Sequence, residues 1–431
     1  MQKEAAWLLG ELKDLIGRGV LDEAAADRLR AHYAQAAMPQ GLGWGMILLA
    51  VGGAALVGLG VILIFAHNWE NWTPEVRVAL SLAPLVLGQL AAFHALRSGS
   101  RLWSEGAGLF TALAIGASIA LVAQTYQFGG DLPRFLLIWT LLALPLVYLL
   151  DSSAAAALCW LGVLGWALVS PHEGWWGETA QDALRLPVFL LLASLPLPHL
   201  MRHIRLDRGG ARVAWLLRVV LLVLVIGLAV APNHRQFGEL LFVYASMAAA
   251  AALAGRLYFS GVQGLWGNPL QGAGQLGVLV IALLMTIREV WPEVDVPRST
   301  LLLIPCALGL LALWLAAQLA RREGPLLPFV LAALTPTVFA LDALAPQQPA
   351  LVSVLGHAYA LVLAAALIRT GLHQGRLGLA NEGAGLIAAV ILLRFFNDDL
   401  SYIVRGAGFI VTGAGFFAAN VWLRRRLRGT S

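Results

Sequence analysis

The chain has 431 residues, of which 59% are hydrophobic and 12% are charged, and its mean hydropathy is +0.78. Soluble domains carry about 25% charged residues, so this composition excludes an ordinary soluble globular protein. The net charge of +5 comes mainly from arginines in short loops between apolar runs, which indicates membrane topology and not binding to nucleic acid.

Residues 1–40 are the polar start of the chain, and they predict a cytoplasmic helical hairpin followed by a linker. Leu8, Leu12 and Leu15 follow helical spacing, and Asp22 is expected to cap a second helix. A hairpin this small cannot bury a stable core alone. We therefore expect residues 1–38 to pack on the membrane domain, on a second copy of the chain or on a cytosolic partner.

Residues 41–423 predict a transmembrane domain, because apolar runs of bilayer-spanning length recur throughout it. The fold class is therefore all-α, a polytopic bundle of about 14 helices in a lipid bilayer, followed by a basic cytoplasmic tail at 424–431. The expected helices cover 44–66, 76–96, 106–127, 134–150, 153–170, 186–200, 213–231, 238–257, 273–291, 299–320, 326–344, 350–369, 377–396 and 402–423.

The loop arginines predict the orientation of this domain. If the N-terminus is in the cytoplasm, the inner loops and the tail hold roughly twice as many arginines as the outer loops. This is the distribution that the positive-inside rule requires. We therefore expect a multi-pass protein of the cell's inner, cytoplasmic membrane with both termini in the cytoplasm.

Polar groups at the outer ends of several predicted helices form the first candidate site. Ionisable groups at membrane depth are costly unless they are compensated. One interpretation is that they cap helix ends and reach the interface. The other is a polar vestibule that binds a ligand, with the carboxylates paired to arginines. The residues are His67, Asn68, Glu70, Gln124, Tyr126, Asp131, Arg394, Asp398, Asp399 and Arg405.

A second candidate is a pair of carboxylates in similar motifs. Glu105 and Glu382 are each followed by Gly-Ala-Gly-Leu, and each is expected to enter its helix from the cytoplasmic side. The motifs indicate either a parallel repeat, as in some transporters, or chance in a chain rich in glycine and alanine.

No motif for catalysis, nucleotide binding or metal binding is evident. His94, His199, His203, His357 and His373 are interpreted as isolated loop or packing residues. We therefore expect no catalytic residues, no metal and no cofactor.

The sequence also resembles a known family. The resemblance is based on three motifs: His67-Asn68-Trp69-Glu70, Glu105 with the glycines that follow, and Ala123-Gln124-Thr125-Tyr126. Through these, residues 1–170 resemble a bacterial family of predicted membrane proteins, domain-of-unknown-function family 2157. The resemblance implies an integral membrane protein of unassigned activity and supplies no catalytic residues.

Transport or flipping of a small polar or amphiphilic solute is the function that this pattern favours, because clustered charges and glycine-rich packing suit a moving bundle. The alternative is a non-enzymatic sensor, scaffold or assembly factor that acts through the N-terminal hairpin. A membrane-embedded enzyme is less favoured, since it would need a converged acid–base pair.

Overall fold

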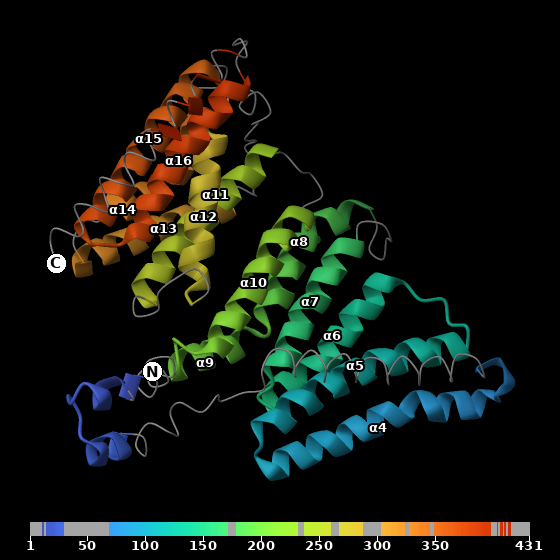
Figure 1. Cartoon of the computed structure of the whole chain (residues 1–431). Helices are drawn as coiled ribbons and strands as arrows, with labels where there is room; N and C mark the ends of the chain where they lie inside the picture. The colour runs from blue at the N-terminus through green and yellow to red at the C-terminus, as the bar shows by residue number, and fades with distance from the viewer. Residues whose placement is uncertain are drawn as a thin grey trace. The chain divides into compact units, whose positions relative to one another are not determined.

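The computed structural model describes residues 11–12, 14–29, 69–170, 178–231, 237–259, 267–287, 303–323, 327–344 and 349–397, with single positions between 403 and 414. Throughout these ranges the chain is helical and contains no strand (Figure 1). The predicted all-α class is therefore confirmed. The chain divides into two compact units, Met1–Arg77 and Val78–Ser431.

The described part of the first unit contains two short helical stretches, at 14–17 and 23–29, joined by a turn. Gly19 lies in this turn with a φ of 69°, a conformation that glycine adopts without strain. Asp22 accepts the N–H of Ala25 through its side chain at 2.7 Å, which is the predicted capping contact. The predicted linker and the first apolar run lie outside the described residues.

The second unit holds the long helices, and the 3-10 helix η1 (Trp69–Asn71) precedes the first of them. The runs predicted at 44–66 and 402–423 lie wholly or mostly outside the described residues. Each of the other predicted runs coincides with one helix, except 186–200, which falls on two. The helices are α4 (Pro74–Ser98), α5 (Arg101–Thr125), α6 (Leu132–Leu149), α7 (Ser153–Val169), α8 (Glu178–Ser194), α9 (Leu197–Leu206), α10 (Ala211–Val230), α11 (Phe237–Tyr258), α12 (Pro269–Leu284), α13 (Leu303–Glu323), α14 (Leu327–Leu344), α15 (Pro349–His373) and α16 (Leu377–Asn397).

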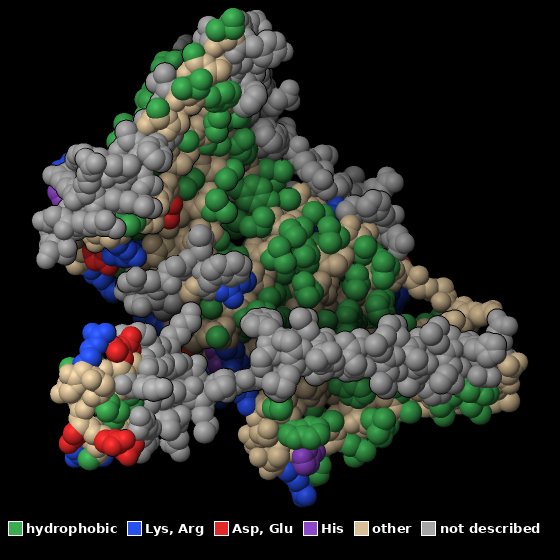
Figure 2. Space-filling model, in the orientation of Figure 1, with side chains coloured by type: hydrophobic (Ala, Val, Ile, Leu, Met, Phe, Trp, Pro, Cys, Tyr) green, Lys and Arg blue, Asp and Glu red, His purple; other side chains and the backbone are tan. Residues whose placement is uncertain are grey.

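Seven of the described helices are long and apolar enough to cross a membrane: α4, α5, α6, α10, α11, α13 and α15. Much of their apolar surface is exposed. On α4, for example, Leu87, Leu90 and Phe93 are 55–60% exposed, and hydrophobic side chains cover wide areas of the visible face (Figure 2). Such exposed apolar faces are unfavourable in water and suit contact with lipid. The chain is therefore a polytopic membrane protein.

The run predicted at 186–200 is divided in the structure. α8 ends at Ser194 and α9 begins at Leu197. Pro196 has no N–H to continue the hydrogen bonding of α8, and Pro198 fits the first turn of the next helix. The single spanning helix predicted here is wrong, because α9 is a separate helix of 10 residues that carries histidines and arginines.

Small residues bring the helices of the second unit close together. A Cβ on Gly274 of α12 would overlap the backbone of Ala252 in α11. One on Gly255 of α11 would overlap the backbone of Gln271 in α12. Van der Waals packing of this kind drives association between helices in lipid, where no hydrophobic effect acts between them. α11 and α12 therefore form a tightly packed pair.

Candidate functional site

A group of buried and half-buried polar side chains gathers where one end of α5, the α6–α7 turn, α9 and the start of α10 meet. We call this group the polar junction. Its members are Glu105, Asp151, Ser152, Ser153, His199, His203 and Arg212.

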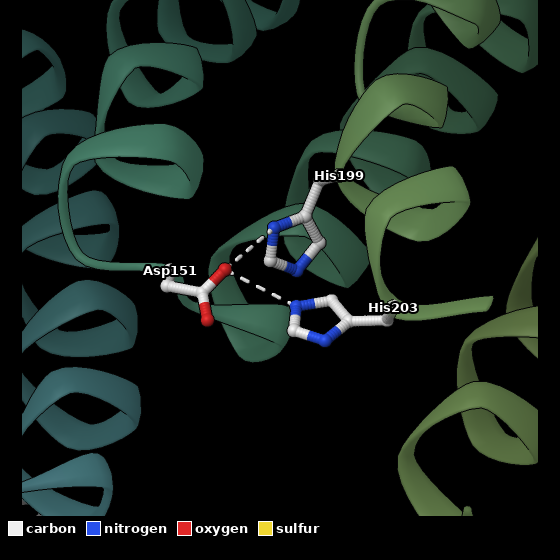
Figure 3. Close-up of side chains that lie close together, drawn as sticks. All are labelled: Asp151, His199 and His203. Atoms are coloured by element: carbon white, nitrogen blue, oxygen red, sulfur yellow. Dashed lines mark hydrogen bonds and ion pairs between the residues drawn. The ribbon is translucent and has the colours of Figure 1, made fainter. Parts of the chain in front are cut away.

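The turn between α6 and α7 positions the aspartate of the junction. Asp151 has a φ of 50°, in the left-handed region that aspartate enters more readily than most residues. The next residue, Ser152, is the N-cap of α7, and its hydroxyl accepts the N–H of Ala155 at 3.2 Å. With the turn held in this way, the Asp151 carboxylate points toward the two histidines of α9 (Figure 3).

Glu105 reaches from α5 to the N-terminus of α7. Its Oε2 accepts the N–H of Ala154 at 2.8 Å and the hydroxyl of Ser152 at 3.1 Å. A carboxylate is favoured there because the first N–H groups of a helix lack internal partners. Gly108, one turn further along α5, permits this approach, since a Cβ there would lie 2.6 Å from the Ser152 hydroxyl.

Arg212, in the first turn of α10, joins the two carboxylates. Its Nη2 lies 3.1 Å from Oε1 of Glu105, and its Nη1 lies 3.4 Å from Oδ2 of Asp151. The guanidinium also donates to the Asp151 carbonyl and to the Ser153 hydroxyl. Its side chain is only 14% exposed. One arginine, with donors on three nitrogens, therefore connects α5, the α6–α7 turn and α10.

The two histidines stand one turn apart on α9 and share one partner. Oδ1 of Asp151 lies 3.4 Å from Nδ1 of His199 and 3.1 Å from Nε2 of His203 (Figure 3). The ring centroids are 4.6 Å apart in an edge-to-face arrangement. Nε2 of His199 lies 3.3 Å from the Ser153 hydroxyl. Both histidines are buried, whereas Arg202, the other cation near Asp151, is mostly exposed.

Burial and neighbouring charges set the ionisation of this group. Burial, assisted by His203, lowers the pKa of His199 to about 4. Burial and the nearby Arg212 also lower the pKa of His203. Partial burial alone would raise the pKa of Asp151, but His203, Arg212, His199 and Arg202 together lower it. At neutral pH the junction therefore presents neutral imidazoles beside an ionised carboxylate.

A second candidate site is a small cavity of about 20 Å³ between α11, α12, α14, α15 and α16. Its wall is apolar except for Gln275 and Glu382. Oε2 of Glu382 is buried and has no hydrogen-bond partner among the described residues. The cavity therefore combines an apolar wall with a carboxylate oxygen that is free to accept a hydrogen bond from a ligand.

The two similar motifs pack differently. In the first motif, the glycine three residues after Glu105, Gly108, is in close contact with the α6–α7 turn. In the second, the glycine directly after Glu382 is in close contact, because a Cβ on Gly383 would lie 2.5 Å from a carbonyl oxygen of α15. Gly385 has open space around it. Glu105 belongs to the polar junction and Glu382 lines the cavity, so the described contacts do not bring the two carboxylates together.

The residues of the predicted outer vestibule are described only in part. Gln124, Tyr126 and Asp131 lie at the turn between α5 and α6, where the first two are exposed. Asp131 is the N-cap of α6, and its side chain accepts the N–H of Arg134. This contact is the helix-capping role that was the alternative to ligand binding. The side chains of Glu70 and Arg394 lie outside the described residues, as do His67, Asn68, Asp398, Asp399 and Arg405 altogether.

The first third of the chain carries a family relationship. Residues 13–156 match the family DUF2157, described as a predicted membrane protein. The DUF2157 match covers most of the segment for which the resemblance was predicted, and it ends inside α7. It therefore includes Glu105, Asp151, Ser152 and Ser153 of the junction, but not His199, His203 and Arg212, which lie on α9 and α10. Comparison with curated proteins and with solved structures gave no significant match.

The sequence interpretation missed the histidine pair beyond the DUF2157 segment. His199 and His203 were interpreted as isolated, and this is wrong, because their rings are in contact. The signal was present: two residues four apart on a helix share one face. The predicted continuous span at 186–200 concealed it, since it placed His199 at the end of a helix and His203 in a loop.

Proposed function

We propose that the protein transports or flips a small amphiphilic solute, and that the solute carries an amine or another hydrogen-bond donor. The observation that carries this proposal is the apolar cavity with Glu382 in its wall. An ionisable residue inside a membrane domain marks a functional site by default, because its burial is costly.

The properties of the cavity support a solute with two chemically different parts. Its volume of about 20 Å³ has room for about one water molecule, so a solute would enter only when the surrounding helices move apart. A buried acceptor without a partner costs about 1–3 kcal/mol, and a donor on the solute would recover this cost at Oε2 of Glu382. The apolar wall would hold the hydrocarbon part. Contributions from five helices suit a site that opens and closes by helix movement.

The outer vestibule fits the same proposal as an entrance. Glu70, Asp131, Asp398 and Asp399 would attract a cationic solute, and Arg394 and Arg405 would balance their charge. We expect Glu70→Ala or Arg394→Ala to lower transport far more than substitutions at 171–177, between α7 and α8. Equal tolerance at both places would remove the vestibule from the proposal.

A flux assay tests the cavity. Purified protein is reconstituted into liposomes that enclose DNA, and entry of ethidium, an aromatic cation, is followed by its fluorescence. We expect faster entry than in protein-free liposomes, and a loss of most of this gain in Glu382→Gln. The matched control is Glu323→Gln, which makes the same chemical change at a carboxylate that is paired with Arg256 and is not part of the cavity lining. Equal rates for wild type and Glu382→Gln would contradict the proposal.

A second candidate function is a non-enzymatic sensor, scaffold or assembly factor. The observation that favours it is the separate compact unit formed by Met1–Arg77. Deletion of residues 1–38 distinguishes the two functions. A transporter would keep its flux without the hairpin, whereas a scaffold would retain its membrane domain and lose a cytosolic partner or its self-association.

A further inference from the structure

We propose that Asp151, His199 and His203 bind a divalent transition-metal ion, with zinc as the preferred type. The inference concerns the polar junction and is independent of the proposed transport function. The three side chains offer one donor atom each, and these atoms all lie within 4.8 Å of one another (Figure 3).

The distances fit the size of a metal site. Zinc binds imidazole nitrogen and carboxylate oxygen at about 2.0–2.2 Å, and donors at tetrahedral angles around it are about 3.3–3.5 Å apart. The two measured separations from Oδ1 of Asp151 are 3.4 Å to His199 and 3.1 Å to His203. The separation between the two histidine nitrogens is within 4.8 Å, so rotations of the side chains would bring all three donor atoms around one ion.

The donor set and its spacing also fit. Imidazole suits zinc, nickel, copper and iron, and neutral histidine with a carboxylate is a common combination. Two histidines four residues apart on a helix present both rings to one ion, which is the spacing that helical zinc motifs use. Three protein ligands leave a fourth position for water or for another ligand.

Neighbouring groups hold the ligands in place, as they do around known metal sites. Nε2 of His199, the nitrogen not turned toward Asp151, lies 3.3 Å from the Ser153 hydroxyl. The second oxygen of the Asp151 carboxylate contacts Arg212. The histidines are buried, but the Asp151 side chain is 38% exposed, so an ion can approach from that side.

Charge does not exclude a cation. Glu105 lies 3.1 Å from Arg212 and compensates its positive charge. Arg202 is 63% exposed, so its charge is largely screened by solvent. The alternative is that no ion is bound, and that Asp151 is hydrogen-bonded to His203 and lies 3.4 Å from His199, as drawn in Figure 3. The experiment is chosen to separate these two states.

The test is a Co²⁺ titration of the full-length protein, purified with an affinity tag that contains no histidine and treated with EDTA before dialysis. Four-coordinate Co²⁺ with nitrogen and oxygen ligands absorbs visible light much more strongly, and at longer wavelength, than octahedral Co²⁺ in water. We expect this absorption to saturate at one ion per chain, and Zn²⁺ to displace it.

Three variants and one control identify the ligands. His199→Gln, His203→Gln and Asp151→Asn should each weaken Co²⁺ binding by at least about tenfold, while His94→Gln, at an exposed histidine of α4, should leave it unchanged. Absence of the absorption in the wild-type protein would overturn the proposal, whatever the variants do. Equal affinity in wild type and His203→Gln would also overturn it, because the ion would then be bound elsewhere.

Discussion

The polar junction depends on one buried cation, and its removal has a predictable effect. Arg212→Gln keeps much of the side chain's length and removes its charge. At about 3–4 Å and an effective dielectric constant of about 20, each ion pair is worth roughly 4–5 kcal/mol before desolvation is subtracted. Removing one partner of a buried pair costs about 3–5 kcal/mol, whereas an exposed pair contributes about 0–1 kcal/mol. Arg212, Glu105 and Asp151 are 14%, 25% and 38% exposed, so we expect a loss of about 2–3 kcal/mol.

The measurement is the free energy of unfolding in mixed micelles, with SDS as denaturant and tryptophan fluorescence as signal. Glu105→Gln and the double variant complete a thermodynamic cycle, for which we expect a coupling of about 1–2 kcal/mol. Arg202→Gln is the matched control. It removes the same type of charge at a similar distance from Asp151 in an exposed position, and it should cost less than about 0.5 kcal/mol. Equal losses for Arg212→Gln and Arg202→Gln would refute the reasoning.

Three further predictions concern packing, hydrogen bonding and topology. Gly274→Ala should lower the free energy of unfolding by about 1–3 kcal/mol, because the added Cβ would overlap the backbone of α11. Gly385→Ala is the control, since there is open space around Gly385, and it should be neutral or slightly stabilising in the same assay. Thr335→Val should cost about 1–2 kcal/mol, because it removes a buried hydroxyl that donates to the carbonyl three residues earlier. In a chain without native cysteines, Gly129→Cys should react with an impermeant maleimide in intact cells and Arg208→Cys should not; labelling of both from one side would contradict the topology.

Hydropathy predicts most of this fold because the bilayer restricts a spanning chain so strongly. Each helix must satisfy its own backbone and present about 20 apolar residues, and both requirements are visible in local sequence. The prediction failed at 186–200, where composition is apolar but two prolines divide the helix. A pair of prolines this close together predicts a break in the helix, even where the hydropathy predicts one continuous span.

The sites were less accessible from sequence than the fold. Glu105 and Glu382 were predicted as a pair of related carboxylates, but the residues around each of them were not predicted. Glu105 caps α7, almost 50 residues away along the chain, and pairs with Arg212, more than 100 residues away. Contacts of this kind depend on which helices pack together, and no spacing in a single sequence reports that. The histidine pair was different, because its spacing of four residues lies within one helix.

The close contacts between helices also restrict how the Glu382 cavity can change shape. α11 and α12 pack closely against each other at Gly255 and Gly274, and α15 packs closely against α16 at Gly383. The remaining wall is α14, which contains Pro336 and therefore lacks one backbone hydrogen bond; the hydroxyl of Thr335 fills that place. Two rigid paired walls and one interrupted helix make an asymmetric enclosure. Among the described helices around the cavity, we expect α14 to bend at the lowest cost, with Pro336 as the hinge.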